Sequence, residues 1–241
     1  NSFSLVRILL SCSALALGVT ACTEPEVILP GKREAIRPDA EVAVVNQSLA
    51  ISLPQQVANA SWAQGHGDPR HRVAHPALSA APQLAWATPI GAGDSRSQRI
   101  TARPLVADGR IYTLDSAARV SAVSPAGAVL WQSDLLPARD DEGQATGGGM
   151  AFADGVLYIS SGFGVLTALD AASGKQIWRQ ELDATGSGEP TVRDGLVYLV
   201  AGDDTGWAVN TKDGRIAWQI EGASSPSNVL GAPAPVITDD L

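Results

Sequence analysis

A repeat of 40 to 47 residues constrains the fold of this chain more than any other feature. Tryptophans at positions 86, 131, 178 and 218 are separated by 45, 47 and 40 residues, and tyrosines at positions 112, 158 and 198 by 46 and 40. Each full copy holds an apolar run, an Asp-Gly pair, a second apolar run and a further turn before the tryptophan. Periods of this size are typical of helical solenoids or of β-propeller blades.

The local chemistry of each copy favours strands over helices. Asp-Gly stands between two β-rich runs at residues 108–109, 154–155 and 194–195, which is a strong hairpin signal. The runs, such as residues 195–201, are almost continuously apolar, as in a sheet that is covered on both faces. We therefore predict an all-β fold, a β-propeller of four-stranded blades, with about three blades and the start of a fourth in this chain. The repeating tryptophans are expected to fill the space between neighbouring blades.

The first 22 residues differ from the rest and predict an export signal. Arg7 precedes an apolar run over residues 8–19, which has the length of a signal-peptide core and is short for a membrane span. Small residues before Cys22 are similar to the lipobox of bacterial lipoproteins, in which the cysteine thiol receives a diacylglycerol. A plain secretory signal with a chance cysteine is the alternative. We expect residues 1–22 to be a lipoprotein signal, residues 23–82 a Pro- and Ala-rich tether that tucks against the domain, and residues 83–241 the partial propeller.

Charge and cysteine content narrow the function classes. The formal net charge of -8 argues against a nucleic-acid partner, because neutralising phosphates needs clustered Lys and Arg. The other cysteine, Cys12, falls inside the predicted signal, so a lipidated Cys22 leaves no pair for a disulfide. The chain starts at Asn1 and stops at Leu241 within an opening repeat, so we expect it to be the N-terminal part of a longer protein.

Candidate catalytic and metal-binding residues are few. His66, His71 and His75 lie close together, but the Gly, Pro and Arg residues among them rule out a helix that would align the rings. We interpret them as structural or solvated. The acidic clusters at residues 140–142 and 203–204 lack the ligand spacing of a calcium loop, and no histidine follows position 75 to serve as a general base. The sequence thus predicts no catalytic residue, no metal and no cofactor.

One stretch carries a family resemblance. Residues 168–178 read Ala-Leu-Asp-Ala-Ala-Ser-Gly-Lys-Gln-Ile-Trp and closely resemble the signature of quinoprotein-like repeats, which recurs weakly at residues 122–131 and 208–218. Two families share this signature: dehydrogenases dependent on pyrroloquinoline quinone, and the BamB lipoproteins of the outer-membrane β-barrel assembly machinery. The dehydrogenases carry adjacent cysteines beside the quinone and long insertions in their blades, whereas this chain has no such pair and its repeats are compact. The lipobox also favours the resemblance to BamB.

The resemblance to BamB implies an eight-bladed, non-catalytic scaffold that is lipid-anchored on the periplasmic face of the outer membrane. It further implies that loops between blades bind a BamA-like barrel-insertion subunit. The matching loop spans residues 222–233, where Val229, Leu230 and Gly231 fit the family's apolar and Gly positions and an expected Arg is absent. Together with Asn228 they form the predicted partner site, although Val229 and Leu230 could instead turn into the core of a plain connecting loop. The alternative function is a periplasmic quinone- or sugar-binding propeller related to the dehydrogenases.

Overall fold

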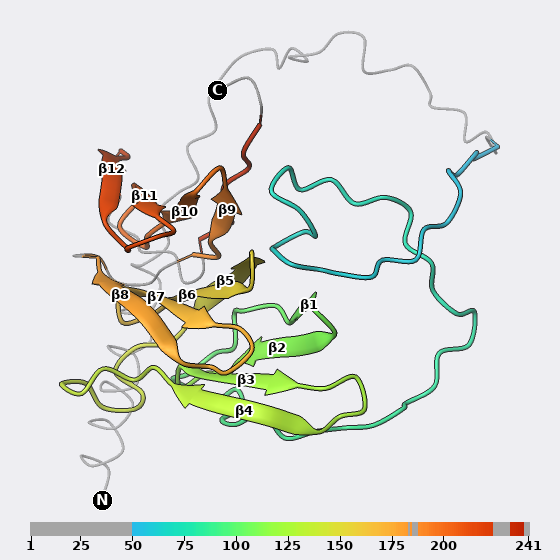
Figure 1. The fold of residues 1–241 in the computed structure, drawn as a ribbon, viewed down its shortest axis with the longest axis horizontal. Helices are drawn as coiled ribbons and strands as arrows, with labels where there is room; N and C mark the ends of the chain where they lie inside the picture. The colour runs from blue at the N-terminus through green and yellow to red at the C-terminus, as the bar shows by residue number, and fades with distance from the viewer. Residues whose placement is uncertain (1–49, 183, 185–187, 224–231, 239–241) are drawn as a thin grey trace, which may run out of the picture. The chain divides into compact units, whose positions relative to one another are not determined.

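Twelve strands form three sheets in the computed structural model, which describes residues 50–182, 184, 188–223 and 232–238. Each sheet is antiparallel and four-stranded, and each strand pairs with the next along the chain (Figure 1). The first sheet consists of β1 (Leu105–Ala107), β2 (Arg110–Leu114), β3 (Arg119–Val123) and β4 (Val129–Asp134). The second consists of β5 (Gly148–Ala153), β6 (Val156–Ser161), β7 (Val165–Asp170) and β8 (Gln176–Glu181). The third consists of β9 (Thr191–Arg193), β10 (Leu196–Val200), β11 (Thr205–Asn210) and β12 (Ile216–Glu221).

The three sheets are blades of a β-propeller, as predicted. Their first strands lie next to one another, β1 against β5 and β5 against β9, while β4, β8 and β12 form the opposite edges (Figure 1). Residues 232–238 follow the third blade and continue this order. The Thr191 hydroxyl donates to the carbonyl of Pro235 at 2.6 Å, and Arg193 Nη1 donates to the carbonyl of Ile237 at 3.0 Å. This segment therefore occupies the place of the first strand of a fourth blade.

The Asp-Gly pairs form the predicted hairpin turns between the first and second strands of each blade. Both residues of each pair have a positive φ; in the second blade the values are 50° at Asp154 and 78° at Gly155. Two successive positive φ angles are the requirement of the type I′ turn, whose twist matches that of the flanking strands. Asp and Gly tolerate this conformation better than most other residues, which explains why the pair recurs.

The recurring tyrosine, alanine and tryptophan form one cross-strand unit in each blade. In the second blade, Ala168 on β7 lies directly between Tyr158 on β6 and Trp178 on β8. The small alanine lets the two rings lean over it, and their centroids are 5.9 Å apart. The other blades repeat the unit, with centroid separations of 6.1 Å for Tyr112 and Trp131 and 6.0 Å for Tyr198 and Trp218. Aromatic pairs at this distance stabilise a sheet beyond the area they bury.

The tryptophans also join neighbouring blades, as predicted. Trp178 is 9% exposed, and its indole N–H donates to the carbonyl of Thr211 in the third blade at 2.8 Å. Gly214 lies against the ring with φ 74°, and a Cβ atom there would come within 2.7 Å of it. The same contact is made by Trp131 with Ala171 and Gly174, and by Trp86 with Pro125 and Gly127. The glycine of the repeat signature is therefore the docking place for the preceding tryptophan.

The acidic residue of the signature closes the turn before the fourth strand. The carboxylate of Asp170 accepts hydrogen bonds from the backbone N–H and the hydroxyl of Ser173. The hydrogen bond from the Ser173 side chain is the main reason that the pKa of Asp170 lies below its ordinary value. The signature of residues 168–178 thus combines a ring spacer, a turn cap, a docking glycine and an inter-blade tryptophan.

The buried core lies between the blades. One cluster joins the first and second blades and includes Tyr112, Val120, Met150 and Leu157. The other joins the second and third blades and is built around Trp178. Both faces of the second blade are therefore covered, which explains the near-continuous apolar character of its strands.

The segment before the first blade has no strand in residues 50–104, apart from isolated bridges of Val57 with Pro76 and of Trp62 with Val106. All of it from Ser52 onward belongs to one compact unit with the blades. In the part of the chain that the structure describes, no helix is long and apolar enough to cross a membrane. The division of the chain at residues 22 and 82 stays a prediction.

Candidate functional site

The residues predicted from the sequence to bind a partner or a lipid lie outside the described part of the chain. Cys22 falls in residues 1–49, and Asn228, Val229, Leu230 and Gly231 fall in residues 224–231. The structure does describe both ends of their loop: residues 222–223 leave β12, and residues 232–238 begin the fourth repeat. The equivalent connection between the first and second blades, residues 135–147, is described completely, so the geometry of such a loop can be read there.

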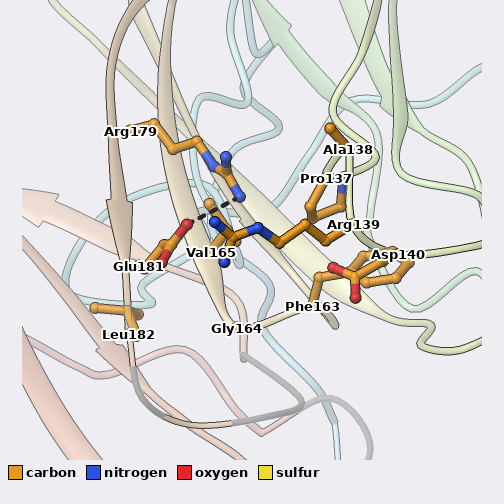
Figure 2. A pocket seen from close by; sticks show the side chains of 10 residues that line it. All are labelled: Pro137, Ala138, Arg139, Asp140, Phe163, Gly164, Val165, Arg179, Glu181 and Leu182. Atoms are coloured by element: carbon orange, nitrogen blue, oxygen red, sulfur yellow. Dashed lines mark ion pairs between the residues drawn. The ribbon is translucent and has the colours of Figure 1, made fainter.

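A cavity of about 430 Å³ lies where the connection from β4 to β5 meets the second blade (Figure 2). Residues 137–140 of the connection form one wall, and residues 163–165 with Arg179, Glu181 and Leu182 form the other. Arg139 from the connection and Arg179 from β8 extend toward the same part of this cavity (Figure 2). A connection between blades thus forms one wall of an open cavity that is lined by polar side chains.

Two arginines and two acidic side chains, Asp140 and Glu181, give this cavity its chemistry. Arg179 Nη2 lies 3.5 Å from Glu181 Oε1, and the Glu181 side chain is 76% exposed, so the ion pair holds the guanidinium only weakly. Guanidinium groups offer planar, forked donors that recognise carboxylates of a partner. Because Asp140 and Glu181 lie beside the arginines, the lining offers charged groups of both signs to a polar ligand. Sequence reasoning missed it, because Arg139 and Arg179 are 40 positions apart and line the same cavity only once the chain has folded.

An apolar surface lies on the third blade. Trp218 and Ile220 on β12 are 46% and 64% exposed, in contrast to the 9% of Trp178 one repeat earlier. With Trp207 and residues 235–238 they line a cavity of about 480 Å³. By the geometry of the first two blades, this is the face on which a following blade packs. No described residue docks on the Trp218 ring in the way that Gly214 docks on Trp178.

The third feature is a polar cluster beside the first strands of the blades. His66, Arg103 and Glu189 line a cavity of about 310 Å³, and Arg103 Nη1 lies 3.0 Å from His66 Nε2. Oε1 of Glu189 is buried and has no hydrogen-bond partner among the described residues. Burial raises the pKa of Glu189, and the nearby charges of Arg103 and His66 oppose this effect.

The three histidines considered in the sequence analysis contact other residues of the segment before the first blade. The His66 and His71 rings are 4.7 Å apart, and His75 Nδ1 lies 2.8 Å from the carbonyl of Pro54. Burial, followed by the neighbouring His66, lowers the pKa of His71. Among the described residues, no group of three or more His, Cys, Asp or Glu side chains could hold a metal ion.

Glu189 should make the stability of the protein depend on pH. Because its folded-state pKa is raised, the neutral form is favoured in the fold, and this contribution is lost as the pH rises through that pKa. We expect Glu189→Gln to raise the thermal midpoint at pH 7 and this gain to shrink toward pH 4. The exposed Glu142→Gln serves as the control. A lower midpoint for Glu189→Gln at pH 7 would show that the ionised carboxylate is a required partner in the fold.

Comparison of this chain with known proteins identifies a family model that matches it. The family model described as "Outer membrane protein assembly factor BamB" matches residues 116–241, which is more than half of the chain. A curated relative, the outer membrane protein assembly factor BamB of Yersinia pestis, is 25% identical over 163 residues, covering 65% of this chain and 41% of the relative. The chain therefore spans less than half the length of this relative.

Dehydrogenases share the repeat as well. The quinohemoprotein alcohol dehydrogenase ADH IIB of Pseudomonas putida is 32% identical over 155 residues, which cover 57% of this chain and 22% of that protein. Among solved structures, the quinohemoprotein alcohol dehydrogenase of Comamonas testosteroni superposes with a TM-score of 0.56 at 24% identity over 67% of this chain and 27% of its own. This likeness supports the propeller fold. The BamB family model matches more than half of this chain, so the chain belongs to the BamB family of outer membrane protein assembly factors.

Proposed function

We propose that this chain is part of a non-catalytic scaffold lipoprotein of the outer-membrane β-barrel assembly machinery. Cys22 carries the lipid that holds it on the periplasmic face of the outer membrane, and loops between blades bind a BamA-like barrel-insertion subunit. One observation carries the proposal: the family match covers the second and third blades and extends through residues 228–231. The cavity formed by residues 137–140 supports it, because a loop of the same kind there presents groups suited to a protein partner.

The most direct test is isolation of the full-length lipoprotein from native membranes, followed by identification of the proteins that accompany it. A BamA-like subunit in stoichiometric amount is the expected result. Isolation without any assembly subunit, from membranes in which the machinery is intact, would contradict the proposal.

Leu230→Asp tests the predicted loop. We expect the affinity for the BamA-like subunit to fall at least about tenfold, because a buried apolar anchor carries much of the energy of an interface and about 1.4 kcal/mol is a factor of ten. The thermal midpoint should stay nearly unchanged. Ala223→Asp, at an exposed position in the same connection, is the matched control and should bind normally. Equal loss of folding and binding would assign Leu230 to the core, and undiminished binding would remove this loop from the site.

A quinone-binding propeller is the second candidate, since the P. putida dehydrogenase is 32% identical over its aligned region. The described residues do not fit that group, because no three acidic, His or Cys side chains converge there to hold an accompanying metal ion. This sequence contains no adjacent cysteine pair, since its two cysteines are at positions 12 and 22. Addition of the quinone with a divalent cation, followed by absorbance and dye-reduction assays, separates the candidates: the scaffold proposal expects neither binding nor turnover.

A further inference from the structure

The first strand of each blade has backbone groups, at the same place in the repeat, that no strand of its own sheet pairs. Val106, Phe152 and Val192 each lie two residues before the Asp of the Asp-Gly turn, opposite Ile111, Leu157 and Val197 on the second strand. Partner residues in an antiparallel ladder alternate between bonded and non-bonded pairs, and the pair next to the one that flanks a two-residue turn is non-bonded. The N–H and C=O groups of these residues therefore point away from their own sheet.

Residues 62–64 fill these positions one after another. Trp62 pairs with Val106 in both directions, with N···O distances of 2.6 and 2.9 Å. The next residue, Ala63, accepts a hydrogen bond from the N–H of Phe152 at 2.7 Å. Residue 64 forms hydrogen bonds with the third blade. Three consecutive residues thus contact three consecutive blades.

Gln64 makes the third connection with its side chain. Its Nε2 donates to the carbonyl of Val192 at 3.0 Å, and its Oε1 accepts from the N–H of the same residue at 2.8 Å. The side-chain amide therefore takes the place of a neighbouring strand. Gln64 is only 6% exposed, so these bonds are shielded from water. A buried backbone amide that loses its partner is destabilising, so the two groups of Val192 depend on this side chain.

The segment continues to the fourth repeat. The N–H of Ile237, two residues after Pro235, donates to the carbonyl of Pro69 at 3.0 Å. Between these ends, Gly65 lies close to Glu189, since a Cβ atom on Gly65 would come within 2.6 Å of the carboxylate, and His66 contacts Arg103. In Figure 1 the segment lies on the side of the sheets that is formed by their edge strands β1, β5 and β9.

We propose that residues 62–69 are an intramolecular strap that occupies a docking surface for extended polypeptide formed by the first strands of successive blades. The strap joins the blades through backbone hydrogen bonds and keeps their open strand edges from pairing with other chains. Unpaired strand edges are templates for an added strand, and proteins cover them for that reason. The proposal does not depend on a partner subunit or on a lipid anchor.

Amide hydrogen exchange on the full chain tests the strap. In Gln64→Ala, we expect the amide of Val192 to exchange at least about tenfold faster, because its acceptor is gone. The amide of Phe152 should also exchange faster, to a smaller extent, while amides within β10 and β11 keep their protection. Gln55→Ala, at an exposed position that precedes the strap, should change none of these rates.

Trypsin cleavage gives a second readout on the same proteins. The bond after Arg72, an exposed residue just beyond the strap, should be cut faster in Gln64→Ala than in the parent protein or in Gln55→Ala. Unchanged exchange at Val192 would show that the strap is not paired in solution and would overturn the proposal. Faster exchange spread evenly over β9 to β12 would also overturn it, because Gln64 would then act as a general stabiliser of the third blade.

Discussion

Trp178→Ala should lower the free energy of unfolding of the full-length protein by about 3–5 kcal/mol, the range observed for buried large-to-small substitutions. Three contacts account for this loss: the ring packs in the cluster between the second and third blades, it pairs with Tyr158, and its N–H donates to Thr211. The Gly214 backbone, which lies against the ring, would face a void. Denaturant titration measures the change.

Two further substitutions separate the contributions at this position. Trp178→Phe retains an aromatic ring and removes the N–H donor, so we expect it to cost less than Trp178→Ala, with about 1 kcal/mol from the lost hydrogen bond. Ile177→Ala, on the adjacent half-exposed position of β8, should cost less than about 1.5 kcal/mol. A loss below about 1 kcal/mol for Trp178→Ala would mean that the inter-blade contact does not hold the blades together.

The repeat could be predicted because each of its parts has a local chemical cause. Asp154 and Gly155 adopt positive φ angles that few other residues tolerate, so the turn is visible in the sequence. Trp178 and Gly214 are complementary in shape, one large and one without a side chain, and their spacing is set by the period of the blade. The propeller fold can be predicted from features of this kind, because each of them can be recognised within a single repeat of the sequence.

The strap could not be predicted, because it binds mainly through backbone groups. A carbonyl such as that of Ala63 is present whatever the residue type, so no sequence pattern marks it. Gln64 is one of three glutamines in residues 50–82, and its role depends on the position of Val192, 128 residues away. The cavity that Arg139 and Arg179 line could not be predicted for a related reason, because it forms where the β4–β5 connection folds against the second blade and not within a local sequence pattern.

Replacement of Cys22 should have the largest effect on the proposed anchoring. Cys22→Ala removes the thiol to which a diacylglycerol is joined, so incorporation of a labelled fatty acid into the protein should fall to background. Stable membrane attachment depends on more than one acyl chain, each buried CH₂ contributing about 0.8 kcal/mol. The variant should therefore be recovered as a precursor or as a species free in the periplasm.

Cys12→Ala is the matched control, because it removes the other cysteine of this sequence and leaves the Val-Thr-Ala-Cys sequence intact. We expect this variant to be labelled and attached like the parent protein. If Cys22→Ala were labelled as strongly as Cys12→Ala, the lipid would lie elsewhere and residues 1–22 would be a plain secretory signal. Because Cys22 lies outside Ser52–Leu241, the thermal midpoint of the blades should be the same in both variants, which separates loss of the anchor from loss of the fold.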